Sequence, residues 1–99
     1  MRLIVGLIGL LILMLAGCTP LLVTGVVTTQ DNCDCTCVSW TTNIPAQCAL
    51  IYCKDGQCTN LGRETEYKTQ HGDGAPRDAQ HITIVAFSKD GQEVTQEVR

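Results

Sequence analysis

The sequence contains few aromatic and few basic side chains. Aromatic residues make up 4% of its 99 residues, and seven Lys and Arg face ten Asp and Glu, which gives a formal net charge of −3. A chain of this charge lacks the basic patch that binds nucleic acid or anionic lipid headgroups. The chain is also short, and its length predicts a small hydrophobic core that needs additional cross-links.

Recognisable catalytic motifs are absent as well. The chain has no assembled nucleophile motif, no phosphate-binding glycine loop and no His or Cys spacing typical of a metal site. We interpret His71 with Asp73 as a solvated pair in a loop. Glu64 and Glu66 read as alternate residues on one exposed strand face. The sequence therefore predicts a protein that is not an enzyme and that carries no cofactor.

The hydrophobic residues are concentrated at the N-terminus. A single basic residue, Arg2, precedes the apolar run Leu3 to Leu15, and the small residues Ala16 and Gly17 follow it. This order of charged, apolar and small residues is typical of an export signal peptide.

The four residues Leu15-Ala16-Gly17-Cys18 complete a recognisable motif. They resemble the lipobox of bacterial lipoproteins, including those encoded by phages and plasmids. The resemblance implies that Cys18 is acylated and becomes the first residue after cleavage. Thr19 after the cysteine, in place of Asp, implies sorting to the outer membrane. The protein is then expected in the cell envelope, held to the membrane by its N-terminal lipid.

An uncleaved membrane anchor is the alternative, because apolar residues resume after Pro20 and extend the segment to Val27. Its length suffices for a spanning helix of about 20 residues, although Pro20 would interrupt that helix. Both interpretations place the rest of the chain outside the cytoplasm. We divide the chain into a signal peptide (1–17), an apolar, Thr-rich linker or first strand (18–30) and a cysteine-rich β domain (31–99).

Six cysteines follow the lipobox: Cys33, Cys35, Cys37, Cys48, Cys53 and Cys58. An even number in a small exported domain predicts three disulfide bonds. Asp55-Gly56 is a strong signal for a two-residue β-hairpin turn, and this turn places Cys53 opposite Cys58. A disulfide bond can join the two directly.

The remaining pairings stay open. Cys33, Cys35 and Cys37 (the early cysteines) would share one face of a strand, nearly 7 Å apart, so at least one is expected to reach Cys48. The pairs could be Cys33 with Cys37 and Cys35 with Cys48, or Cys35 with Cys37 and Cys33 with Cys48. In a rival arrangement, each early cysteine forms a disulfide bond with one of Cys48, Cys53 and Cys58. Cys35-Thr36-Cys37 could also be read as a redox pair.

Two segments share the motif Lys-Asp-Gly-Gln between an apolar run and a returning strand, at Ala49–Thr59 and Ile84–Val94. Each predicts a β-hairpin. Trp40 is expected on the strand face opposite the early cysteines, as a core residue or otherwise as a binding anchor. We expect a strand within Arg63–Gln70 and a loop over His71–Pro76.

The fold class expected is small and all-β, made of antiparallel hairpins stapled by disulfide bonds. The expected function is that of a membrane-anchored interaction module with a protein partner in the envelope. Small phage and plasmid lipoproteins that block receptors or exclude competitors resemble it in size and plan. One alternative is a structural outer-membrane component such as a pilotin or a spanin, although spanins tend to be richer in proline than this chain with its three prolines. The other is a Cu(I) or Zn(II) protein that uses the six cysteines as thiolate ligands.

Overall fold

The computed structural model describes residues 19–30 and 34–99. They form six strands: β1 (Val23–Gln30), β2 (Cys35–Lys54), β3 (Gln57–Asn60), β4 (Lys68–Pro76), β5 (His81–Ser88) and β6 (Glu93–Glu97). Every strand pairing is antiparallel. The described part of the chain contains no helix, which confirms the predicted all-β class.

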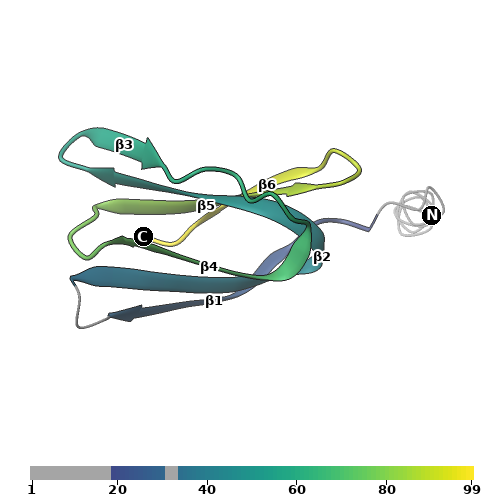
Figure 1. Cartoon of the computed structure of the whole chain (residues 1–99), viewed down its shortest axis with the longest axis horizontal. Helices are drawn as coiled ribbons and strands as arrows, with labels where there is room; N and C mark the ends of the chain where they lie inside the picture. The colour runs from purple at the N-terminus through teal and green to yellow at the C-terminus, as the bar shows by residue number, and fades with distance from the viewer. Residues whose placement is uncertain (1–18, 31–33) are drawn as a thin grey trace, which may run out of the picture.

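The 20-residue strand β2 organises the whole domain, because four of the five other strands pair with it. Its first half lies between β1 and β4, and its second half lies between β3 and β5, with β6 added beyond β5. Between Thr41 and Ala46 the register shifts, and β2 bends so that its halves belong to two facing layers (Figure 1). Pro45 lies in this bend, where the missing backbone N–H interrupts no ladder.

The core fills the space between the two layers. Even-numbered residues of β2 face inward, so Val38, Trp40 and Leu50 are almost completely buried, at 1–3% exposed. Ile82 and Ile84 of β5 are also fully buried, and Ile84 lies beside Leu50 as its ladder partner. This period of two is the pattern of a strand with one buried face. It confirms the prediction that Trp40 is a core residue.

Both predicted hairpins are confirmed. Asp55 and Gly56 adopt positive φ angles of 51° and 78°, as a two-residue turn of type I′ requires, and Cys53 pairs with Cys58 in the register between β2 and β3. The second hairpin has a longer connection, because Phe87 and Glu93 form its last ladder pair.

Two segment predictions were wrong. The segment His71–Pro76 is not a loop but most of strand β4, and the strand expected within Arg63–Gln70 begins only at Lys68. The pairing with β2 shows this, because residues 70–76 lie in register opposite residues 35–41, with His71 and Ala75 buried. The glycines that suggested a loop, Gly72 and Gly74, lie on the exposed face, where a strand needs no large side chain.

The described chain begins at Thr19. Leu21 is 2% exposed and belongs to the core, and the expected first strand is present as β1. The signal peptide predicted over 1–17, Cys18 and Cys33 lie outside the described residues. Among the described residues, no helix is long and apolar enough to span a membrane.

Candidate functional site

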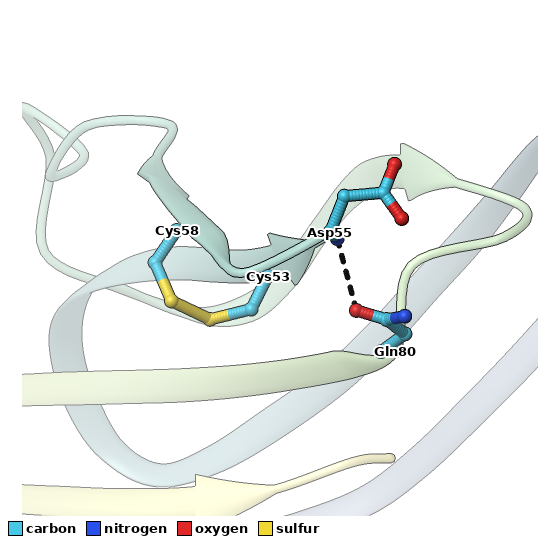
Figure 2. The surroundings of a disulfide bond; sticks show 4 residues. All are labelled: Cys53, Asp55, Cys58 and Gln80. Carbon is cyan, nitrogen blue, oxygen red and sulfur yellow. Dashed lines mark hydrogen bonds between the residues drawn. A yellow bond between two sulfur atoms is a disulfide. The ribbon is translucent and has the colours of Figure 1, made fainter.

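The first predicted staple is present. Cys53 and Cys58 form a disulfide bond, with their Cα atoms 4.0 Å apart. The hairpin is also tied to the segment between β4 and β5. The side-chain oxygen of Gln80 accepts the Asp55 backbone N–H at 2.9 Å, and the backbone N–H of Gln80 donates to the Cys53 carbonyl at 2.8 Å. Figure 2 shows the side chain of Gln80 reaching the turn beside the disulfide.

The expected bridges from Cys35 or Cys37 to Cys48 are contradicted by the structure, and Cys33, the other candidate partner of Cys48, lies outside the described residues. Cys48 is 1% exposed and unpaired on the inner face of β2, whereas Cys35 and Cys37 are unpaired on its outer face. Thiols on opposite faces of one strand cannot bond to each other. In the part of the chain that the structure describes, neither Cys35 nor Cys37 therefore pairs with Cys48.

Cys48 instead belongs to a buried polar cluster that the sequence interpretation missed. The Cys48 thiol, a carboxylate oxygen of Glu64 and a ring nitrogen of His71 lie within 4.8 Å of one another. The side chain of His71 is fully buried, and that of Glu64 is 22% exposed. His71 is therefore not the solvated partner of Asp73 that we expected, and Glu64 does not lie on an exposed strand.

Hydrogen bonds hold this cluster in one arrangement. Oε1 of Glu64 contacts Nδ1 of His71 at 2.7 Å and accepts the Cys48 backbone N–H at 2.7 Å. The backbone N–H of Glu64 donates to the carbonyl of Cys48 at 3.0 Å. Nε2 of His71 contacts the hydroxyl of Thr42 at 3.1 Å, and Lys68 pairs with Glu64 Oε2 at 3.3 Å. Glu64 thus fastens the segment before β4 to the inner part of β2.

Trp40 covers the cluster. Its ring stacks on that of His71, with centroids 5.6 Å apart and an angle of 11° between the planes. Its indole N–H donates to the Cys48 sulfur at 3.4 Å. Burial raises the pKa of the Cys48 thiol, and the charge of Glu64 adds to this, against the opposing effect of the Trp40 hydrogen bond. A thiol with a raised pKa is a poor nucleophile at neutral pH, so the arrangement does not indicate nucleophilic catalysis.

Several connections meet at one end of the domain, which we call the hairpin end: the turn at Asp55, residues 77–80 and Asp34. Lys54 forms an ion pair with Asp78 at 3.0 Å, and the Arg77 guanidinium lies 3.9 Å from the Asp34 carboxylate. A cavity of about 410 Å³ lies among these side chains, with Pro76 in its wall. The hairpin end therefore combines a fixed backbone with exposed charges of both signs.

The opposite end, which we call the bend end, contains the bend of β2, the turn between β5 and β6, and residues 19–22 (Figure 1). Gln92 of that turn donates to the Thr19 carbonyl at 2.8 Å and accepts the Leu21 N–H at 2.9 Å. Asn43 in the bend accepts the Leu22 N–H at 2.7 Å and donates to the Pro20 carbonyl at 2.7 Å. These bonds fix the start of the described chain against the bend end.

No protein-family model, no curated protein and no solved structure matches this chain.

Proposed function

We propose that this protein is a lipoprotein of the cell envelope, anchored through acylated Cys18, that binds a protein partner through the hairpin end. One observation carries the proposal: Thr19, the residue after Cys18, is fixed at the bend end by Gln92. The strands run from this end to the hairpin end (Figure 1). Acyl chains on Cys18 therefore place the bend end at the membrane and turn the hairpin end away from it.

The attachment needs no spanning helix. Each buried methylene of an acyl chain contributes about 0.8 kcal/mol, and two or more chains give stable anchoring. The Thr19–Leu22 segment is short and hydrogen-bonded to the domain, so it keeps the domain close to the lipid. The expected location is the outer membrane, because Thr19 rather than Asp follows the lipobox cysteine.

The hairpin end has the features of a protein-binding surface. The disulfide and the bonds of Gln80 fix the hairpin before a partner arrives, which reduces the entropy lost on binding. Its charged groups, Lys54 and Asp78 among them, suit a polar partner surface of mixed charge. Its place at the end opposite the proposed anchor leaves this surface accessible to a protein in the envelope.

The anchor is tested by replacing Cys18 with Ser and labelling growing cells with a fatty acid. We expect the native chain to incorporate the label and the Cys18→Ser chain to lose it, together with a change in processed mass. A native chain that carries no label, and a Cys18→Ser chain that stays in the membrane at full length, would show that Leu3 to Val27 is an uncleaved anchor.

The partner surface is tested by photo-crosslinking in intact cells. A photoreactive amino acid is placed at Gln57 or Asp78 on the hairpin end, and at Lys89 on the bend end as the matched control, since all three are exposed. We expect one protein adduct from Gln57 and Asp78 that mass spectrometry identifies, and none of that protein from Lys89. Adducts only from Lys89, or from no position, would refute binding through the hairpin end.

A further inference from the structure

Cys48, Glu64 and His71 bring a sulfur, an oxygen and a nitrogen ligand to one point between the two layers of the sheet. Their ligand atoms lie within 4.8 Å of one another. A tetrahedral metal ion at about 2.0–2.3 Å from each ligand needs ligand atoms about 3.3–3.8 Å apart. The 2.7 Å contact between Glu64 Oε1 and His71 Nδ1 therefore has to open, and the wider separations in the cluster, up to 4.8 Å, have to shorten by about 1 Å. Cys48 comes from the second half of β2, His71 from β4, and Glu64 from the segment that precedes β4.

The chemistry of these three ligands favours one class of ion. Thiolate and imidazole ligands together suit Zn(II), whereas Mg(II) and Ca(II) prefer oxygen ligands alone. A site with three protein ligands leaves the fourth position of tetrahedral Zn(II) for water. The Glu64 side chain is 22% exposed while that of His71 is fully buried, so solvent and an ion reach the cluster from the Glu64 side.

The neighbours of the three residues have the roles of outer-shell groups in metal sites. Such groups orient the ligands by hydrogen bonds and strongly affect metal affinity. Thr42 contacts Nε2 of His71 at 3.1 Å and leaves Nδ1 directed at Glu64. Trp40 stacks on the His71 ring and donates its N–H to the Cys48 sulfur, which fixes both ligands.

We propose that Cys48, Glu64 and His71 form a binding site for one Zn(II) ion inside the β-sandwich. This site is separate from the cysteine cluster considered for the whole sequence, because Cys35 and Cys37 lie on the outer face of β2 and are exposed. The proposal is independent of the lipid anchor and of the partner surface. It links β2 to β4, in addition to the disulfide that joins β2 to β3 at the hairpin end.

The test uses the full chain, purified in detergent with its disulfide intact and stripped with a chelator. Zn(II) is added, and bound metal is measured by mass spectrometry and by competition with a chromophoric chelator. We expect one equivalent of Zn(II). The variants Cys48→Ser and His71→Gln should bind it more than about 100-fold more weakly, since loss of an outer-shell group alone typically costs about 10–100-fold. Cys37→Ser is the matched control on the same strand, and it should bind like the native chain.

A measurement on the native chain covers the case in which a core variant fails to fold. Co(II) in place of Zn(II) should give the charge-transfer absorption of a thiolate ligand. Zn(II) should also protect Cys48, but neither Cys35 nor Cys37, from an alkylating reagent after brief exposure to denaturant. Absence of stoichiometric Zn(II) binding would overturn the proposal. Binding that Cys37→Ser abolishes, or protection of Cys35 and Cys37 in place of Cys48, would also overturn it by assigning the metal to the outer face.

Discussion

The side-chain amide of Gln92 donates to the carbonyl oxygen of Thr19 at 2.8 Å, although 73 positions separate the two residues in the sequence. The same side chain accepts the N–H of Leu21 at 2.9 Å. One residue of the turn between β5 and β6 therefore binds both Thr19 and Leu21 of the N-terminal segment. Leu21 completes the core at this end, with 2% exposure. The position of the first described residues thus depends on a side chain near the C-terminus.

Replacing Gln92 with Ala should release this segment while leaving the sheet folded. A hydrogen bond contributes about 0.5–1.5 kcal/mol net, so we expect the protection of the Leu21 amide from hydrogen exchange to fall by about tenfold. Gln96→Ala is the matched control, because the Gln96 side chain is exposed on β6 and, among the described residues, bonds to the neighbouring Glu97 carbonyl alone. Equal loss of protection in both variants would show that Gln92 has no specific effect.

Loss of the hairpin disulfide should lower stability moderately. The double variant Cys53→Ser with Cys58→Ser opens a short loop, for which chain-entropy reasoning predicts a loss of about 2 kcal/mol in the free energy of unfolding. Urea denaturation of the purified protein measures this loss. The double variant Cys35→Ser with Cys37→Ser is the control, since both thiols are exposed and unpaired, and it should stay within about 0.5 kcal/mol of the native chain.

Peptide mapping without reduction checks the pairing itself. We expect a cross-linked peptide pair that joins Cys53 to Cys58, with Cys35, Cys37 and Cys48 recovered as free thiols. A peptide that joins Cys53 to an early cysteine would contradict the structure.

Local patterns in the sequence were sufficient to predict several parts of the fold. Asp55-Gly56 predicts a type I′ turn because few other residue pairs tolerate two positive φ angles, and the disulfide follows from that turn. Trp40 could be placed in the core because its alternation with the early cysteines fixes its face. These features depend on residues close to one another in the sequence.

The unpaired state of Cys48 and its place in the buried cluster could not be predicted in the same way. Cys35, Cys37 and Cys48 lie on one 20-residue strand, and odd and even positions along it face opposite sides. The parity of 35 and 48 would have excluded their pairing, but the strand was not recognised as continuous through Pro45. The cluster around His71 needs contacts between residues 16 and 23 positions apart, for which the sequence contains no local signal.

The packing of β5 predicts a large difference between neighbouring substitutions. Ile84 is fully buried between the layers, whereas Val85 points to the outer face and is half-buried. Ile84→Ala should lower the free energy of unfolding by about 2–5 kcal/mol, the range for large core residues replaced by Ala. Val85→Ala should cost about 1 kcal/mol, close to the average for single substitutions. Equal losses, measured by urea denaturation, would contradict the assignment of the two faces.

Acid should loosen the bend end before the rest of the domain. The hydroxyl of Ser88 and, to a smaller extent, the amide of Gln92 bond to the Asp90 carboxylate and lower its pKa below the usual 3.8. Because the charged form is favoured in the folded state, its contribution to stability is complete above pH 3.8 and is lost as the pH falls through the lower folded-state pKa.

Protonated Asp90 loses its charge and holds the Gln92 side chain less strongly, and Gln92 in turn holds Thr19 and Leu21. We therefore expect the protection factor of the Leu21 amide to fall only once the pH drops below 3.8, through the lowered pKa of Asp90, while the Ile84 amide stays protected. Asp90→Asn should lower protection of Leu21 at neutral pH and remove most of its dependence on acid. Asp73→Asn is the matched control, because the Asp73 carboxylate bonds to the adjacent Gly74 N–H on β4. An acid response of Leu21 that Asp90→Asn leaves unchanged would assign the effect to other carboxylates.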